Sequence, residues 1–240
     1  MADEPVKNEP IKDNEFTHRL FTEEVKYNKH RLFVGEFASL DHELDEIIHK
    51  LSESQPNDTL EITISSPGGF TYDLMKIENV CREYFYNRVT TKLNSYGFSC
   101  GAFLFLIGDE RIIFENSELM FHNVSMGMGG KFNEIEDQFI FNKKYWENYI
   151  TQSCAPYFTK TELTNLIKGK DFWLDALEMC KRKIATQVCV FGQYMDADLY
   201  VKYRTNPKEQ RDLVKELSKL EDGLSLKDQD FLRYKSQELE

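Results

Sequence analysis

The 240-residue chain lacks most of the features that indicate a secreted, metal-binding or membrane-spanning protein. Its five cysteines are odd in number and scattered without a C-x-x-C pair, which argues against a disulfide framework or a zinc site. The longest apolar run, residues 102–107, is far too short to cross a membrane. Residues 1–15 are polar and acidic, so we expect neither a secretory signal nor a transit peptide. These absences predict a cytoplasmic protein without a metal or cofactor.

Positive charge is also scarce. The chain has 30 Lys and Arg residues against 41 Asp and Glu residues, a formal net charge of −11, and no basic patch interleaved with aromatic residues. An acidic surface repels phosphates and anionic headgroups, which argues against nucleic acid or membrane as a partner.

The composition changes along the chain and predicts three parts. Residues 1–28 are rich in charged and amide side chains and have few core formers, so we expect a flexible N-terminal segment. Residues 29–192 carry the apolar patterns of one folded domain. Residues 193–240 form a charged extension, in which leucines recur at helical spacing after Pro207 and predict an amphipathic helix.

Within the central part, apolar alternation and helical spacing follow each other in a β-α rhythm. Strands are expected near 30–35, 60–64, 89–94, 111–114, 118–122 and 184–190, with helices between most of them. This rhythm predicts an α/β fold with mostly parallel strands. A longer helix, at about 133–153, is so aromatic and so charged that we expect it to project from the domain and pair with another subunit.

The most informative short motif is Gly97-Phe98-Ser99-Cys100-Gly101, which lies where a strand meets an apolar helix. A serine between two glycines at such a junction is typical of a nucleophile elbow. An α/β-hydrolase would place its acid and then its histidine well downstream. The last histidine of this chain, His122, follows Ser99 too closely for that order, so the α/β-hydrolase interpretation fails.

A serine nucleophile needs a base, an acid that orients the base, and donors for the oxyanion. Ser99 and His122 both end predicted strands, and neighbouring parallel strands bring such residues to one edge of a sheet. Asp171, which precedes Phe172-Trp173, is a candidate acid, although periodicity alone does not select it among the many carboxylates.

Four segments in this order, 66–69 (SPGG), 99–104 (SCGAFL), 116–122 (NSELMFH) and 171–176 (DFWLDA), resemble the ClpP family of self-compartmentalised serine peptidases. The resemblance covers about residues 30–190. It implies a ClpP/crotonase-like α/β fold of repeated β-β-α units, with the long helix as a projecting handle. It also implies that Ser99 is the nucleophile, His122 the general base and Asp171 the residue that orients the base.

Further expectations come from the same resemblance. The backbone N–H groups of Gly68 and Cys100 would form the oxyanion hole, and Gly69, Gly129 and Gly130 would hold a polypeptide substrate by β-augmentation. The resemblance also implies a homo-oligomer of two heptameric rings, a tetradecamer, that encloses a chamber and can dock an AAA+ unfoldase.

The chain departs from the family pattern in three places. Residues 1–15 lack the apolar side chains that line the family's axial pore, which argues against an unfoldase partner and favours an ATP-independent endopeptidase. Lys183 and Thr186 stand where a glycine and an acidic residue are common. The segment after about residue 190 is longer than usual. Three alternatives stay open: a phage prohead maturation protease, a non-catalytic ClpP-like ring subunit, and an acyl-CoA enzyme of the crotonase type.

Overall fold

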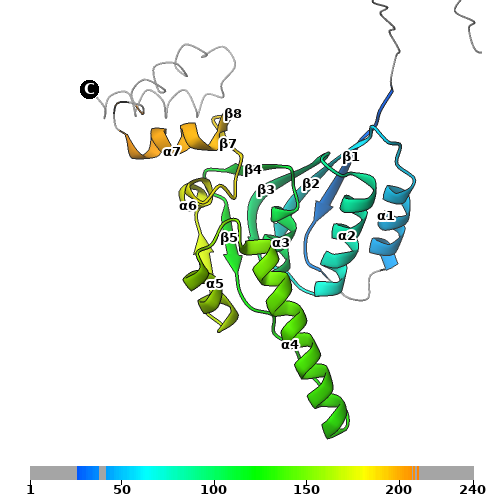
Figure 1. Ribbon diagram of the computed structural model, residues 1–240. Coiled ribbons are helices and arrows are strands. Elements are labelled where there is room, and N and C mark those ends of the chain that lie inside the picture. Colours follow the sequence, from blue (N-terminus) through cyan, green and yellow to red (C-terminus); the bar gives the residue numbers. More distant parts are fainter. Residues whose placement is uncertain (1–25, 38–41, 207, 209, 211–240) are drawn as a thin grey trace, which may run out of the picture.

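The structure, a computed structural model, describes residues 26–37, 42–206, 208 and 210. The expectations for residues 1–25 and for the leucine-rich helix after Pro207 lie outside the described residues. The elements in chain order are β1 (Lys29–Val34), α1 (His42–Ser52), β2 (Thr59–Ser66), α2 (Thr71–Tyr84), β3 (Val89–Phe98), α3 (Cys100–Leu106), β4 (Glu110–Phe114), β5 (Glu118–Phe121), α4 (Phe132–Cys154), α5 (Lys160–Ile167), β6 (Phe172–Leu174), α6 (Ala176–Lys181), β7 (Gln187–Val190), β8 (Gln193–Asp196) and α7 (Ala197–Thr205) (Figure 1).

The described strands form one sheet in the order β1-β2-β3-β4-β7-β8, with β5 and β6 branching from β3. The neighbours from β1 to β4, and the pair β4–β7, run parallel, whereas the pairs β5–β6 and β7–β8 run antiparallel. The predicted α/β class with a sheet rich in parallel strands is therefore confirmed.

Strand β3 is the element that creates the branch. Its first half pairs with β4, from Thr90 opposite Glu110 to Leu93 opposite Ile113. Its second half turns to β5, where Tyr96 lies opposite Glu118 and Phe98 opposite Met120. One strand thus serves two neighbours in succession, and its C-terminal end lies beside the end of β5.

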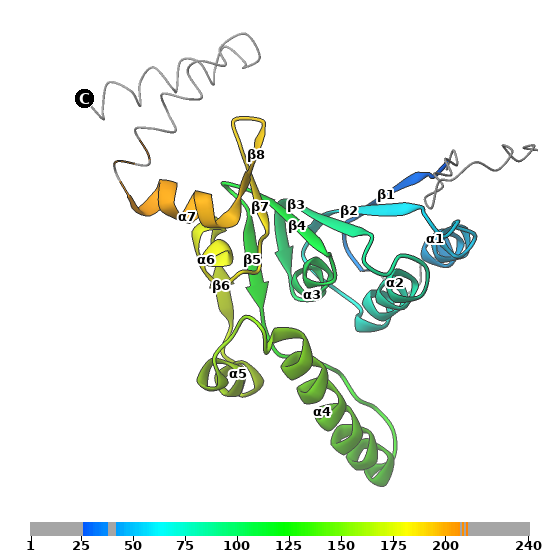
Figure 2. The ribbon, with the colours of Figure 1, turned by 45° about the horizontal axis from the view of Figure 1, so that its top comes forward.

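Helices α1, α2 and α3 lie side by side against one face of the sheet (Figure 2). In β2 the side chains of residues 60, 62 and 64 are buried while those of 61, 63 and 65 are half-exposed, as the alternation predicts. Helix α3, apolar on all sides in the sequence, is buried from Cys100 to Phe105. This burial fixes the N-terminus of α3 against the sheet.

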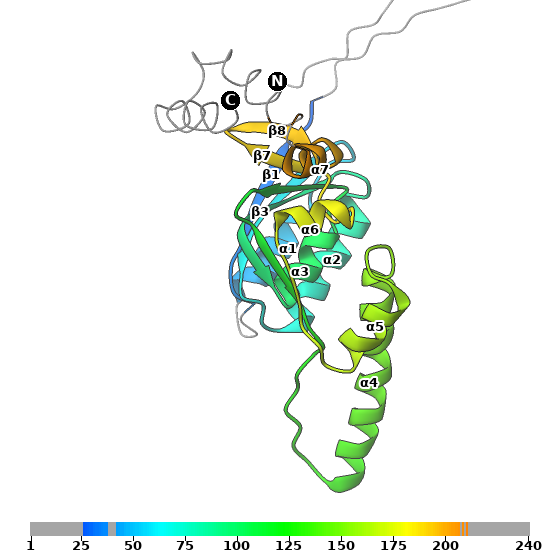
Figure 3. The same ribbon diagram turned by 90° about the vertical axis from the view of Figure 1, so that its left-hand side faces the viewer.

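Helix α4 is the long helix expected at about 133–153, and it projects away from the sheet (Figures 1 and 3). Only its C-terminal part is held in the core, through Trp146, Ile150 and Cys154. Its projecting part exposes Phe132, Phe139, Ile140 and Phe141 to solvent. Exposed apolar side chains gathered on one helix in this way are typical of interaction sites.

Several elements were not expected from the sequence. Helix α5 begins with a capping box in which Thr159 and Glu162 each bond the other's backbone N–H. Strand β8 forms a hairpin with β7, and α7 packs behind it through the fully buried Tyr200. The boundary expected at residue 192 therefore falls within this hairpin, and residues 193–205 pack against the domain.

Candidate active site

Ser99 occupies the turn between β3 and α3. Its φ of 54° and ψ of −122° lie in a region that side chains other than glycine rarely adopt. The glycines on either side permit this turn, because a Cβ on Gly101 would come within 3.0 Å of Ser66 Cβ and one on Gly97 within 2.9 Å of Leu93. Ser99 therefore sits on a nucleophile elbow, as the G-x-S-x-G motif indicates.

His122 lies next to Ser99. Its Nε2 atom is 2.8 Å from Ser99 Oγ, and the ring is half-buried. The register explains this placement, since Phe98 is opposite Met120 and the Ser99 amide donates to Met120 O at 2.9 Å. The residue after β3 and the residue after β5 therefore meet at the same edge of the sheet.

Asp171 lies across from His122, but the two residues are not bonded. The antiparallel pair β5–β6 places Phe121 opposite Phe172, so one further step would set His122 opposite Asp171. Asp171 is exposed, and no hydrogen bond or ion pair in the described part of the chain joins it to His122. Asp171 thus lies one residue beyond the β5–β6 pairing, on the side of His122, and in this conformation the two side chains are not in hydrogen-bond contact.

The two expected oxyanion donors differ in their surroundings. Cys100 is the first residue of α3, where backbone N–H groups have no partner within the helix. The Gly68 N–H instead donates to Ser66 Oγ at 3.1 Å, within the chain. Gly68 has a φ of 99°, and a Cβ there would lie 2.6 Å from Ser99 Cβ, so only glycine lets this loop approach the elbow.

The Cys100 side chain is not a competing nucleophile. Its Sγ donates to the carbonyl oxygen of Gly69 at 3.2 Å, and burial raises the pKa of the thiol to about 11. At neutral pH the group is therefore a thiol rather than a thiolate, and the thiolate is the reactive form.

A cavity of about 280 Å³ opens beside Ser99 and His122. It is lined mainly by apolar side chains from α2, α3, β5 and α4, namely Leu74, Phe103, Met120, Trp146 and Ile150. Tyr149 also borders it, and its hydroxyl donates to Glu78 Oε2 at 2.9 Å. A cavity of this size and lining fits one apolar side chain of a ligand.

The glycines expected to bind substrate are dispersed. Gly69 borders the cavity and forms an isolated parallel bridge with Phe37. Gly129 and Gly130 lie in the segment between β5 and α4, outside the cavity lining and without strand structure. A strand requires a paired neighbour, and within the described residues this segment has none.

Two residues with a direct part in this geometry were missed in the sequence. Ser66 holds the Gly68 amide, and its signal was a serine two residues before a glycine, which is the spacing of a local Ser turn. Trp146 and its neighbours close the cavity from α4, and no sequence pattern links that helix to Ser99.

Among the described residues, no cluster of His, Cys, Asp or Glu is arranged to hold a metal ion. None of the described helices has the length and apolar character needed to cross a membrane.

The sheet is rich in parallel strands, and it brings the elbow serine within hydrogen-bond distance of a histidine. This combination places the protein among α/β proteins whose site resembles that of serine hydrolases. The sequence model of the Clp protease family matches residues 28–190, more than half of the chain. The chain therefore belongs to the Clp protease family, a family of peptidases. This match confirms the resemblance predicted from the sequence motifs. No curated protein matches the chain significantly.

Proposed function

We propose that this protein is a serine endopeptidase that cleaves polypeptides through an acyl-enzyme on Ser99. The observation that carries the proposal is the 2.8 Å separation between Ser99 Oγ and His122 Nε2 at a strained elbow. At that distance His122 accepts the hydroxyl proton as Oγ attacks the peptide carbonyl, and later donates it to the leaving amine. Water then hydrolyses the ester and restores the serine.

The remaining groups have supporting roles. Asp171 would orient the imidazole and stabilise its charged form once it has moved into hydrogen-bond contact with His122. The Cys100 and Gly68 amides would stabilise the oxyanion once Gly68 has exchanged its bond to Ser66 for one to the substrate. The apolar cavity would receive the side chain that precedes the cleaved bond.

Assembly into rings is part of the same proposal. The exposed aromatic and aliphatic side chains of α4 would meet those of a second ring, and the chamber between two rings would confine the substrate. The segment 125–130, which pairs with no strand in the described part of the chain, would gain a partner when an extended substrate strand lies beside it.

The proposal is tested by hydrolysis of a fluorogenic peptide with leucine before the scissile bond. We expect turnover by the wild type, loss of nearly all turnover in Ser99→Ala, and unchanged turnover in Ser95→Ala, which alters the same strand away from the site. Equal turnover in the wild type and Ser99→Ala would contradict the proposal. A wild type that assembles without any turnover would instead support the non-catalytic ring subunit.

A further inference from the structure

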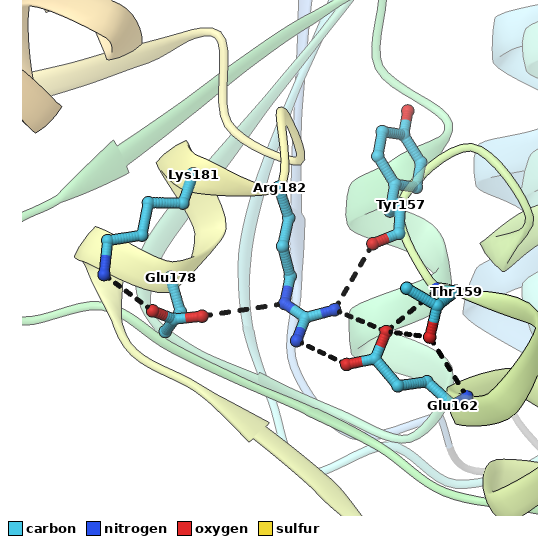
Figure 4. Close-up of polar contacts among 6 residues, drawn as sticks. All are labelled: Tyr157, Thr159, Glu162, Glu178, Lys181 and Arg182. Atoms are coloured by element: carbon cyan, nitrogen blue, oxygen red, sulfur yellow. Dashed lines mark hydrogen bonds and ion pairs between the residues drawn. The ribbon is translucent and has the colours of Figure 1, made fainter.

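Arg182 connects the C-terminal end of α6 to the N-terminal end of α5 (Figure 4). It follows α6, and its guanidinium donates to both carboxylate oxygens of Glu162, at 2.7 and 3.2 Å, and to the Tyr157 carbonyl at 3.3 Å. The side chain is 21% exposed, and its buried Nε atom has no hydrogen bond and lies 3.8 Å from a Glu178 oxygen. A two-pronged bond of this kind fixes orientation as well as distance.

The acceptor, Glu162, belongs to the N-terminus of α5. One of its oxygens also accepts from the Thr159 backbone N–H at 2.8 Å and from the Thr159 hydroxyl at 2.9 Å. The hydrogen bonds from Arg182 and Thr159 lower the pKa of Glu162 to about 2. Arg182 thus acts on the cap of α5 and holds the start of this helix against α6.

The other end of α5 is tied to the general base. The carbonyl of Ile167, the last residue of α5, accepts a 2.7 Å hydrogen bond from Asn123 Nδ2, and Asn123 directly follows His122. Asp171 comes four residues after Ile167 along the chain. Helix α5 is therefore connected to Arg182 at its start, and to His122 and Asp171 at its end.

A second line of contact runs through aromatic rings. The Arg182 guanidinium lies 5.0 Å from the ring centre of Phe158. The Phe158 ring packs edge-on against Phe121 and Phe172, each at 5.4 Å. Phe121 precedes His122 and Phe172 follows Asp171, so one ring supports the neighbours of both residues.

We propose that Arg182 is a positioning residue that sets the distance between His122 and Asp171 through α5 and Phe158. This inference rests on the proposed function, because it assigns Asp171 the task of orienting His122. Without Arg182, α5 and the Phe158 ring lose their anchor on α6. Asp171 then samples positions too far from His122 to stabilise the imidazolium.

The first experiment compares Arg182→Met with a matched control, Lys181→Met. Lys181 is the preceding residue, and among the described residues its side chain has a single hydrogen bond, to Glu178 at 3.0 Å. We expect Arg182→Met to lower kcat about ten- to a hundredfold with KM changed less than about twofold, since misplaced catalytic groups cost rate more than binding. Lys181→Met should match the wild type. A rise in KM alone, or equal effects of the two substitutions, would overturn the proposal.

The second experiment repeats Arg182→Met in an Asp171→Asn background. If Arg182 acts through Asp171, the substitution should now lower kcat by less than about twofold. A loss as large as in the wild-type background would show a general structural effect and overturn the assignment. Glu162→Gln, which keeps the shape of the cap, should also lower kcat, but by a smaller factor than Arg182→Met. Arg182→Lys should recover part of the lost rate.

A third readout does not depend on turnover. Amide hydrogen exchange, followed by mass spectrometry, reports how firmly α5 and β6 are held. We expect faster exchange across residues 160–174 in Arg182→Met than in Lys181→Met, because only the first substitution removes the contacts of Arg182 with Glu162 and Phe158. Identical exchange in the two variants would overturn the positioning role even if the protein hydrolyses no peptide.

Discussion

The Gly68 amide donates its hydrogen bond to the Ser66 hydroxyl, 3.1 Å away within the same loop. One of the two expected oxyanion donors is therefore engaged before any substrate arrives. An N–H that must leave one acceptor before it serves another contributes less to the transition state than a free one.

Removal of the competing acceptor should increase reactivity. In Ser66→Ala the Gly68 amide no longer has to break a bond whose net value is about 0.5–1.5 kcal/mol, so fluorophosphonate labelling should be about two- to tenfold faster. The same substitution leaves a buried donor unpaired and should lower Tm. Ser65→Ala, on the neighbouring residue, is the control and should alter neither the labelling rate nor Tm. A slower reaction in Ser66→Ala would show that the Ser66 bond instead holds the loop in its reactive form.

Tyr149 on α4 supports a buried charge on α2. Its hydroxyl donates to Glu78 Oε2, and Glu78 is only 7% exposed. Tyr149→Phe should lower the free energy of unfolding by about 1–3 kcal/mol, because the buried carboxylate loses a donor. Tyr145→Phe on the same helix is the matched control, since its exposed hydroxyl has, among the described residues, a single hydrogen bond, to the Met75 sulfur. Chemical denaturation of both variants measures the difference, and equal stabilities would contradict this role for Tyr149.

The Arg182–Glu162 pair predicts a dependence of stability on pH. The folded-state pKa of Glu162 is about 2, below its ordinary value of 4.5, so the pair stabilises the fold above about pH 4.5 and loses this effect as pH falls toward 2. Glu162→Gln should therefore lower Tm at neutral pH and reduce the fall in Tm between about pH 5 and about pH 3. Glu134→Gln, which alters an exposed carboxylate at the start of α4, is the control. Parallel wild-type and Glu162→Gln curves would contradict the prediction.

The projecting part of α4 should determine assembly. Phe139→Glu places a charge in the exposed apolar surface of α4. If that surface joins the two proposed rings, the substitution should halve the native mass, because a charge in an apolar interface is costly. Lys143→Glu changes an exposed charge on the same helix and should leave the mass unchanged. Native mass spectrometry compares the variants. Equal masses for the wild type and Phe139→Glu would show that α4 does not form the interface between subunits.

Local patterns predicted the elements that the core requires. The alternation in β2 and the apolar run of α3 correspond to buried positions, and the motif around Ser99 correctly indicated an elbow. The bend of β3 was not predictable, since the expected strand ended at residue 94 and no spacing shows that a strand changes partner. Helix α5 was missed although its capping box, Thr159 to Glu162, is visible in the sequence.

In the candidate site, too, some features could be predicted from the sequence and others could not. Ser99 and His122 could be paired by reasoning about strand ends, and the register of β3 and β5 supplies the reason. The position of Asp171 depends on an antiparallel strand of three residues, which is too short to be distinguished from a loop in the sequence. The hydrogen bond of Ser66 and the bonds of Arg182 are tertiary contacts, and composition and periodicity carry no information about them.

The most direct measurement of the central claim is the site of fluorophosphonate attachment, mapped by mass spectrometry of the digested protein. The account predicts one adduct per chain, on Ser99, with a rate that falls by orders of magnitude in His122→Gln because the base is lost. An adduct on any other residue, or labelling of Ser99 at the same rate in His122→Gln, would contradict a nucleophile activated by His122.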